Sequence, residues 1–345
     1  MGIEFSGIAK DGQAPKLVTL SNAAGMEITV MDIGAAWLSC KVPVDNSLRE
    51  VLLGVSSIED YERQQVYLGS TVGRYANRIA GGKFSIDGNS YQVDTNQAGN
   101  CLHGGRDGFD KRRWSIVKQT PNSVAFELTS HDGDQGFPGE LKAQVCYALS
   151  DENAVTIEYQ ASTTKATTIN LTNHAYFNLL SADGDDTILG HSLRLDTEYY
   201  LPTNSVGIPL GDSLSSRGSA FDFTVAKTLD CYAMEDEQLK QAKGYDHCYV
   251  STRPHDEDKP LAWLQSPDDK VVLTVSTTKP GIQVYTGNWL AGTPNRKGGV
   301  YSDYQGIALE TQYLPDSPNR SWTDSNAILY PTEHYLQCTT YAFRF

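Results

Sequence analysis

Alternation of apolar and polar residues with a period of two recurs along the chain and limits the folds that it can adopt. Four segments carry apolar residues at alternate positions: Val124, Phe126 and Leu128; Val145, Tyr147 and Leu149; Val155, Ile157 and Tyr159; and Val271, Leu273 and Val275. Successive side chains of a strand point to opposite faces, so this pattern is typical of half-buried antiparallel strands. The sequence therefore predicts an all-β fold.

Turn signals are frequent in the sequence, and helical signals are scarce. The pair Asp87-Gly88 supplies the positive φ angles of a tight hairpin. Ser57 and Asp60 form an S-x-x-D capping box, and residues 235–243 are long enough for two helical turns. Long loops rich in Gly, Asp and Asn occupy residues 132–139, 181–190 and 291–304. Without an internal repeat or a Pro/Ser-rich linker, residues 1–345 are expected to form one large β-sandwich domain with few short helices.

The charge balance excludes several classes of partner. A formal net charge of −14 and an isoelectric point near 4.9 predict that the protein binds neither nucleic acid nor a membrane surface. The six cysteines are scattered without a C-x-x-C pair, which is typical of reduced thiols in the cytosol. Residues 1–16 lack a signal-peptide core, and no apolar run approaches the ~18 residues that span a bilayer. We therefore expect a cytoplasmic location.

Motifs for cofactors and metals do not occur in the sequence. There is no Walker A loop, no G-x-G-x-x-G, no H-E-x-x-H and no G-x-S-x-G. Ser162 and Lys165 match S-x-x-K without the partner motifs that give it meaning. Asp132 and Asp134 begin like a calcium loop, but Ala143 stands where the bidentate Glu is required. We expect no nucleotide cofactor and no zinc or calcium site.

Two polar segments in the first third of the chain have both structural and functional interpretations. Residues 73–79 place Arg74 and Arg78 around Asn77, which suits either a solvated strand end or a set of fixed donors for hydroxyl groups. Residues 100–105 place His103 before two glycines. That pattern suits either a simple turn or a backbone that approaches a ligand closely.

Two later segments carry further polar residues at regular spacing. In an extended segment over residues 170–179, His174 and Tyr176 share one face with Thr172 and Asn178, and this face is unusually polar for the exterior of a sheet. A His flanked in this way can be fixed in one orientation. Glu310 follows three apolar residues, so its carboxyl group is expected near the core, where burial favours the protonated form.

Taken in order, these segments resemble the aldose 1-epimerases, also called galactose mutarotases. The similarity extends from about residue 17 to residue 345. The most specific stretches are N-x-T-N-H-x-Y-F-N-L at residues 170–179, N-x-L-H-G-G at residues 100–105, and Glu310 with Pro315-Asp316. D-G-D-Q-G-F-P-G at residues 132–139 and Y-T-G-N at residues 285–288 match as well. The resemblance implies a large antiparallel β supersandwich.

The resemblance also implies roles for individual residues. His174 matches the general acid that protonates the ring oxygen of a hexose, and Glu310 matches the general base that takes the proton of the anomeric hydroxyl. His103 matches a second active-site histidine, which hydrogen-bonds the sugar near the reacting centre. The remaining substrate-binding positions implied are Asn77, Arg78, the neighbouring Arg74, Tyr176, Asp246 and Gln283. No metal and no cofactor is implied.

The chemistry of the residues agrees with this expectation. Opening a cyclic hemiacetal requires removal of a proton from the C1 hydroxyl and delivery of one to the ring oxygen. An imidazole with an ordinary pKa near ~6.5 can serve as acid in one step and base in the next. The expected reaction is therefore interconversion of the α and β anomers of free hexoses such as D-glucose and D-galactose.

Three alternatives remain open at this point: a hexose-6-phosphate mutarotase, a sugar sensor without activity, and a glycosidase that uses Asp246 and Glu310. The first requires a cationic pocket, and the last requires two carboxylates spaced across the scissile bond. The sequence after Asn319 departs from the proline-rich stretch expected for the family. The sequence as a whole leaves open which sugar is preferred and whether the protein is a monomer or a homodimer.

Overall fold

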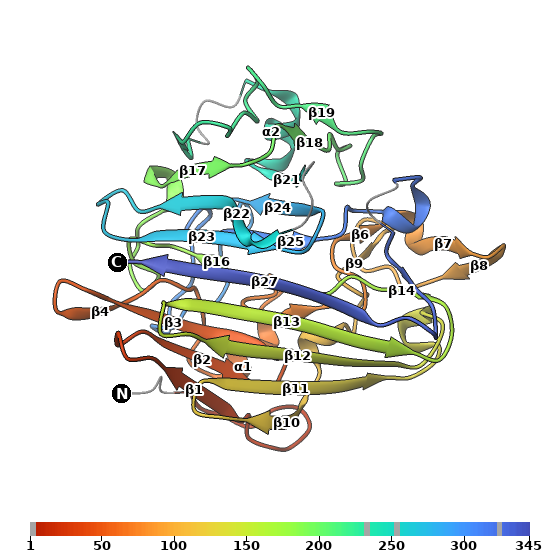
Figure 1. The fold of residues 1–345 in the computed structure, drawn as a ribbon, viewed down its shortest axis with the longest axis horizontal. Helices are drawn as coiled ribbons and strands as arrows, with labels where there is room; N and C mark the ends of the chain where they lie inside the picture. Colours follow the sequence, from red (N-terminus) through yellow and green to blue (C-terminus); the bar gives the residue numbers. More distant parts are fainter. Residues whose placement is uncertain (1–4, 231–234, 252–255, 323–325) are drawn as a thin grey trace.

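The computed structural model describes residues 5–230, 235–251, 256–322 and 326–345, and these residues form antiparallel sheets with little helix. The largest sheet has nine strands in the spatial order β10 (Ser115–Gln119), β11 (Ser123–Ser130), β12 (Leu141–Leu149), β13 (Ala154–Thr163), β27 (Tyr335–Arg344), β23 (Val272–Thr277), β22 (Asp256–Gln265), β17 (Ser192–Leu195) and β20 (Lys227–Thr228). Its long strands cross the molecule in Figure 1. The all-β prediction is confirmed.

Two further sheets pack against the nine-stranded sheet. A six-stranded sheet has the order β16 (Tyr176–Phe177), β25 (Ile307–Gln312), β24 (Gly281–Tyr285), β21 (Asp246–Val250), β18 (Tyr199–Tyr200) and β19 (Leu214–Ser215). A four-stranded sheet consists of β1 (Leu17–Ser21), β2 (Glu27–Met31), β3 (Ala36–Val44) and β4 (Ser47–Glu50). Ring contacts of Trp37 with Phe177 and Tyr341, at 5.9 and 5.6 Å between centroids, join all three sheets.

Short strand pairs and single-turn helices complete the fold. The pairs are β5 (Thr71–Val72) with β15 (Thr172–Asn173), β6 (Arg78–Ile79) with β9 (Cys101–Leu102), β7 (Lys83–Ile86) with β8 (Asn89–Gln92), and β14 (Thr167–Thr168) with β26 (Ile328–Leu329). The α-helices of the described residues are α1 (Ile58–Arg63) and α2 (Glu237–Ala242). Short 3₁₀ turns are η1 (Ala80–Gly82), η2 (Phe109–Lys111), η3 (Asp134–Gly136), η4 (Ile188–Gly190) and η5 (Ser317–Asn319).

Local signals in the sequence correspond to these elements. Asp87 and Gly88 adopt φ angles of 51° and 79° at the turn between β7 and β8. The Ser57 side chain accepts a hydrogen bond from the Asp60 N–H at the start of α1, as its capping box predicts. The expected helix over residues 235–243 is α2. None of the described helices has the length and apolar content to cross a bilayer.

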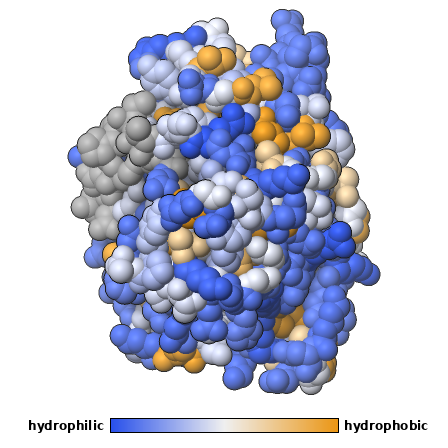
Figure 2. Space-filling model, turned by 90° about the vertical axis from the view of Figure 1, so that its right-hand side faces the viewer, coloured by the Kyte–Doolittle hydropathy of each residue, from blue (hydrophilic) through white to orange (hydrophobic). Residues whose placement is uncertain are grey.

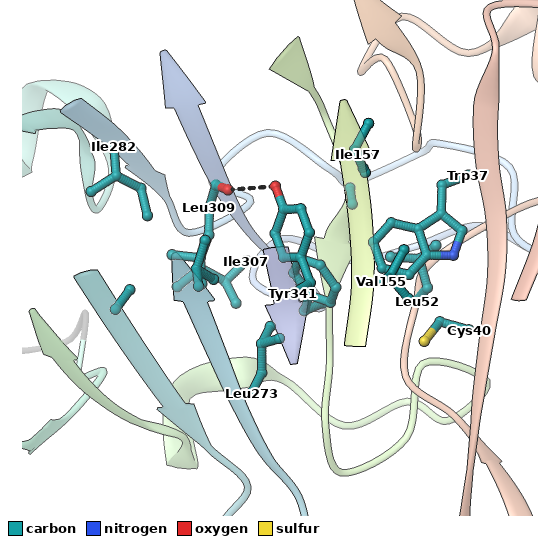
Figure 3. Close-up of a cluster of buried hydrophobic side chains, with 14 of the residues drawn as sticks. Trp37, Cys40, Leu52, Val155, Ile157, Leu273, Ile282, Ile307, Leu309 and Tyr341 are labelled. Atoms are coloured by element: carbon teal, nitrogen blue, oxygen red, sulfur yellow. Dashed lines mark hydrogen bonds between the residues drawn. The ribbon is translucent and has the colours of Figure 1, made fainter. Parts of the chain in front are cut away.

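The alternating apolar residues point into one continuous core. In β12, for example, Val145, Tyr147 and Leu149 are buried while the residues between them are partly exposed. Figure 3 shows the centre of this core, where the Tyr341 hydroxyl of β27 donates to the Leu309 carbonyl of β25 over 3.2 Å. The face shown in Figure 2 is largely hydrophilic, and its apolar residues lie in small separate patches.

The cysteines contribute to packing. Cys40, Cys101, Cys146, Cys248 and Cys338 are free thiols. Cys231 lies outside the described residues. The expectation of unpaired thiols is therefore confirmed for the cysteines that the structure describes.

The position of Phe177 generates a test of the fold. Phe177 is fully buried at the point where the three sheets meet, so Phe177→Ala is expected to lower the free energy of unfolding by ~3–5 kcal/mol. Val117→Ala, on an edge strand where Val117 is 46% exposed, serves as the control and should change it by less than ~0.5 kcal/mol. Urea denaturation followed by fluorescence measures both values; equal effects would contradict this view of the core.

Candidate active site

A cleft of about 350 Å³ opens over one face of the six-stranded sheet. This volume lies at the lower end of the ~300–1,000 Å³ that is usual for sites of small molecules. The lining is polar and aromatic and consists of Gln65, Val66, Tyr67, Asn77, Arg78, Gln97, Leu102, His103, His174, Tyr176, Asp246, Tyr285, Trp289 and Glu310. Seven of the nine site residues expected from the sequence are in this set.

Strand register forms the floor of the cleft. Glu310 of β25 pairs with Gln283 of β24, and Tyr285 of β24 pairs with Asp246 of β21. Directly paired residues share a face of a sheet, and so do residues two apart on one strand, which puts these four side chains on one surface. Tyr176 joins them because it pairs with Ala308, two residues before Glu310.

The opposite wall comes from strands β6 and β9 and the residues beside them. The His103 N–H donates to the Asn77 carbonyl over 3.0 Å, and the Asn77 N–H donates to His103 Nδ1 over 3.1 Å. Both residues have positive φ angles, of 51° and 64°. The two polar segments of the first third of the chain are therefore joined at the cleft.

The twin glycines after His103 serve this junction. A Cβ atom on Gly104 would lie 1.9 Å from the Gly73 carbonyl oxygen, so only glycine allows the two backbones to approach so closely. Neither Gly104 nor Gly105 lines the cleft. The glycines therefore allow a close approach between two segments of the protein's own backbone, and not between the backbone and a ligand.

The hydrogen bond to His103 fixes its tautomer. Because Nδ1 accepts the Asn77 N–H, the neutral ring must carry its proton on Nε2. The ligand atoms of His103, His174 and Glu310 lie within 4.8 Å of one another, a spacing that resembles a metal site. However, a protonated Nε2 has no lone pair for a metal ion. The donor set therefore fits a hydrogen-bond donor at His103 better than a metal ligand.

His174 and Glu310 form a buried pair. His174 Nε2 lies 3.5 Å from Glu310 Oε1, and the two side chains are 5% and 3% exposed. Within the described part of the chain, His174 Nδ1 and Glu310 Oε2 have no hydrogen-bond partner. Buried polar atoms are normally satisfied, and unsatisfied ones are typical of sites that bind a further molecule.

Burial controls the protonation of this pair. Desolvation lowers the pKa of His174 to about 4. Desolvation and the negative charge of Asp246 raise the pKa of Glu310 to about 8, against the opposing effect of Arg78. Near neutral pH the pair therefore holds one proton, and the favoured arrangement has this proton on the carboxyl group and the imidazole neutral.

Asp246 is held by two neighbours. The Gln283 amide donates to Asp246 Oδ1 over 2.6 Å, and Arg78 Nη2 lies 3.7 Å from Asp246 Oδ2. Arg78 Nε also donates to Gln97 Oε1 over 3.1 Å. Gln283 itself does not line the cleft, so its contact with the site runs through Asp246.

Arg74 differs from the expectation, because it lies outside the cleft. It is 2% exposed, and its guanidinium group donates to the carbonyl oxygens of Pro138, Gly139 and Ser130. Arg74 therefore holds the loop over residues 130–139 in place. In this position it contributes to the structure and does not reach the lining of the cleft.

The expected polar face of residues 170–179 is confirmed only in part. His174 and Tyr176 line the cleft, whereas Thr172 and Asn178 do not. The Asn178 amide donates to the carbonyl oxygens of Asp186 and Gln305. The segment is interrupted between β15 and β16, so its residues do not follow one uninterrupted alternation.

Sequence reasoning missed five residues of the lining that are large and polar or aromatic. They are Gln65, Tyr67, Gln97, Tyr285 and Trp289. Tyr285 stands in the matched Y-T-G-N stretch, which could have indicated it. No local signal marks Tyr67, whose ring is stacked on His174 with 5.7 Å between centroids.

Comparisons with known proteins agree with this geometry. The family model described as aldose 1-epimerase matches residues 16–342. The chain belongs to the aldose 1-epimerase family. It is 45% identical over 343 residues to the aldose 1-epimerase of Escherichia coli K12, covering 99% of this chain and 98% of that protein. It is 39% identical over 295 residues to the galactose mutarotase of Mus musculus, covering 85% and 84%.

The fold of the family is shared as well. The structure of an aldose epimerase homologue from C. elegans matches with a TM-score of 0.88 and 30% identity, covering 96% of this chain and 99% of that one. The β supersandwich expected for an aldose 1-epimerase is thus confirmed. Membership in this family identifies the chain as an isomerase that acts on carbohydrates.

The buried carboxyl group of this epimerase generates a prediction about stability. Because folding raises the pKa of Glu310 from 4.5 to about 8, the native state keeps a proton that the unfolded state loses within this pH range. The contribution of Glu310 to the free energy of unfolding should therefore fall as the pH rises from ~4.5 to ~8, in the opposite direction to that of buried His174, whose lowered pKa makes its own contribution rise with pH. Glu310→Gln removes this loss, so its melting temperature should exceed that of the wild type by several degrees at pH 8.5.

The same comparison at pH 5 provides the internal control. There Glu310 is protonated and similar in shape to glutamine, so the difference in melting temperature should shrink. Glu140→Gln, on a side chain that is 49% exposed, controls for the substitution itself. If Glu310→Gln changed the melting temperature by the same amount at pH 5 and at pH 8.5, the cause could not be the ionisation of buried Glu310, and the prediction would be contradicted.

Proposed function

We propose that this protein is a mutarotase that interconverts the α and β anomers of free hexoses such as D-glucose and D-galactose. The observation that carries the proposal is the buried pair of His174 and Glu310, with Nε2 and Oε1 3.5 Å apart in a cleft of suitable size for one sugar ring. The relatives named aldose 1-epimerase and galactose mutarotase support the substrate class.

Ring opening is assigned to this pair as follows. The Glu310 carboxylate accepts the proton of the C1 hydroxyl, and the His174 imidazolium donates its proton to the ring oxygen. The bond between C1 and the ring oxygen breaks while the C1 carbonyl forms. The products are an open-chain aldehyde, a protonated Glu310 and a neutral His174.

Ring closure uses the same groups in reverse. Rotation about the C1–C2 bond presents the other face of the carbonyl. Neutral His174 then removes the proton of the C5 hydroxyl, and protonated Glu310 donates to the carbonyl oxygen, which becomes the new anomeric hydroxyl. No proton is gained or lost over the cycle, and each positioned group can contribute ~10²–10⁴-fold to the rate.

The electrostatics of the cleft suit the open-chain intermediate. Burial favours the proton on Glu310 and the neutral form of His174, which is the arrangement left by ring opening. Ring opening itself starts from the charged arrangement of the same pair. Because the charged arrangement is the minor form near neutral pH, forming it costs free energy, and the proton transfers of ring opening then recover that cost.

The other lining residues orient the sugar in this proposal. His103 offers the Nε2–H that its tautomer requires, as a donor near the reacting centre. Asn77, Arg78, Tyr176 and Asp246 provide donors and acceptors for the remaining hydroxyl groups. Gln283 contributes by fixing the orientation of the Asp246 carboxylate.

The cleft gives less support to the alternative reactions. A hexose 6-phosphate requires a cationic pocket, but Arg78 in the lining already faces Asp246, and Glu310 lies nearby. In a glycosidase, Asp246 would be the second carboxylate, yet it is occupied by Gln283 and Arg78. A sensor without activity would have no use for a pair poised to exchange a proton.

Substitution of the pair tests the proposal directly. His174→Asn and Glu310→Gln should each lower kcat/KM for mutarotation by at least ~10²-fold, because each removes one proton-transfer group. Polarimetry of freshly dissolved α-D-glucose and α-D-galactose measures the rate. The exposed pair of His131 and Glu140, whose Nδ1 and Oε2 atoms lie 3.2 Å apart, gives matched controls in His131→Asn and Glu140→Gln. Wild-type rates in either cleft variant would refute the assignment.

The pH profile provides an independent test. Below pH ~4 both His174 and Glu310 are protonated, so the base is lost; above pH ~8 both are deprotonated, so the acid is lost. A plot of kcat/KM against pH is expected to be bell-shaped, with limbs near these values that belong to the coupled pair. A rate that is constant from pH 3 to pH 10 would contradict proton transfer by this pair.

A further inference from the structure

Tyr67 is a lining residue in an unusual backbone conformation. It lies in the loop between α1 and β5 with a φ angle of 59°, in the left-handed region that tyrosine rarely adopts. Its side chain is half-buried and forms part of the cleft wall. Conformations of this kind persist only where the surroundings enforce them, and they cluster at functional sites.

Hydrogen bonds within the loop enforce this conformation. The Gln64 side-chain carbonyl accepts the N–H groups of Val66 and Leu68 over 2.8 and 3.4 Å, on both sides of Tyr67. The Tyr67 carbonyl accepts the Ser70 N–H over 3.0 Å. The backbone of Tyr67 is thus fixed from its own loop.

The loop is also tied to the backbone of His174. The Gly69 N–H donates to the His174 carbonyl over 3.0 Å, and the His174 N–H donates to the Ser70 carbonyl over 2.8 Å. The Asn173 amide donates to the Gly69 carbonyl over 2.6 Å. The position of Tyr67 is therefore coupled directly to that of the imidazole beside it.

The ring of Tyr67 contacts both histidines of the cleft. It stacks on His174 with 5.7 Å between centroids and an interplanar angle of 24°. It meets His103 edge-on at 4.6 Å and 60°. One aromatic side chain therefore covers both imidazoles on the side of this loop.

The remaining groups around His174 come from the other walls. The acidic ones are Glu310 on β25 and Asp246 on β21, and the basic Arg78 on β6 acts on the neighbouring His103. The uncharged titratable ones are His103, Tyr176 and Tyr285, with ring centroids 5.3, 4.8 and 6.4 Å from that of His174. None of them belongs to the loop between α1 and β5.

We propose that Tyr67 is a positioning residue that fixes both imidazole planes and excludes water from them. In this role it forces the proton to pass between His174 and Glu310 through the bound sugar. The inference rests on the proposed mutarotase activity for its purpose. The effect of Tyr67 on the two imidazoles does not depend on bound sugar, so it can be measured on the protein alone.

Removal of the ring should change the titration of His174. Burial is the main cause of the lowered pKa of His174, so water admitted by a smaller side chain should raise this pKa from about 4 toward its ordinary value. Loss of the ring would also remove the attraction between the ring face and the His174 imidazolium, which lowers the pKa. This contribution to the pKa is smaller than that of burial. The net shift is expected to be upward by about one pH unit.

The experiment compares Tyr67→Phe, Tyr67→Ala and Tyr67→Asn with the wild type. ¹⁵N NMR of the histidine rings, without sugar, measures the pKa of His174, and polarimetry measures kcat and KM. Tyr67→Phe keeps the ring and should keep the pKa. Tyr67→Ala and Tyr67→Asn should raise the pKa and the acid limb of kcat/KM together and lower kcat about tenfold or more. Asparagine tolerates the left-handed backbone, so this variant tests the ring if alanine unfolds the loop.

Tyr304 offers a matched control, because it is half-buried, has a φ angle of 66° and does not line the cleft. Tyr304→Ala should leave the pKa of His174 unchanged. An unchanged pKa of His174 in Tyr67→Ala and Tyr67→Asn would overturn the proposal. Because the NMR titration needs no turnover, it decides the role of Tyr67 even if the wild type fails to equilibrate hexose anomers, a result that would instead refute the proposed function.

Discussion

Strand β25 is packed on both faces, and the two faces have opposite chemistry. Leu309 points into the core, where its carbonyl oxygen accepts the Tyr341 hydroxyl, and the Thr311 hydroxyl meets that of Thr339 on the same side. Glu310, between them in sequence, points into the cleft. The period of two that builds the core thus also places a carboxyl group at the floor of the cleft, where its side chain is only 3% exposed. Neighbouring strands in register with β25 supply the rest of the floor.

This placement lowers stability, and in the proposed mechanism the same physical effect supports proton transfer. A carboxylate that loses its hydration is destabilised unless a partner compensates, and the nearest group is an imidazole that is equally desolvated. Neither group can hold a charge easily, so a single proton shared between them is the favoured state near neutral pH. In the proposed mechanism a sugar that bridges the two groups lets the proton pass between them, because the charged and the neutral arrangements of the pair hold the same number of protons.

The sequence predicts those features that depend on neighbours along the chain. Alternation specifies the faces of long strands, Asp87-Gly88 specifies a hairpin, and Ser57 specifies a helix start, because each signal acts within a few residues. Arg74 and Arg78 look equivalent in the sequence, yet the carbonyl groups that hold Arg74 come from residues 130–139. The place of the Tyr67 loop beside His174 depends on hydrogen bonds of Gly69 to residues 173 and 174, and the partner of Gln283 depends on strand pairing. Such contacts have no signature in a single sequence.

The support behind His174 follows the same electrostatic logic. Lys279 Nζ is fully buried and donates to the Leu171 carbonyl over 2.5 Å, and it lies 2.6 Å from the Tyr335 hydroxyl, which accepts the Leu171 N–H over 3.1 Å. Burial lowers the pKa of Lys279 well below its ordinary value, while the rings of Tyr159, Tyr313 and Tyr335, at 5.5, 5.6 and 5.3 Å from Nζ, favour the charged ammonium. Lys279 Nζ donates to both the Leu171 carbonyl and the Tyr335 hydroxyl, so it supports the C=O of Leu171 directly and the N–H of Leu171 through the hydroxyl. This buried lysine therefore fixes the backbone just before β15, three residues from His174, while the charge that acts on the imidazole of His174 comes from Asp246 in the cleft.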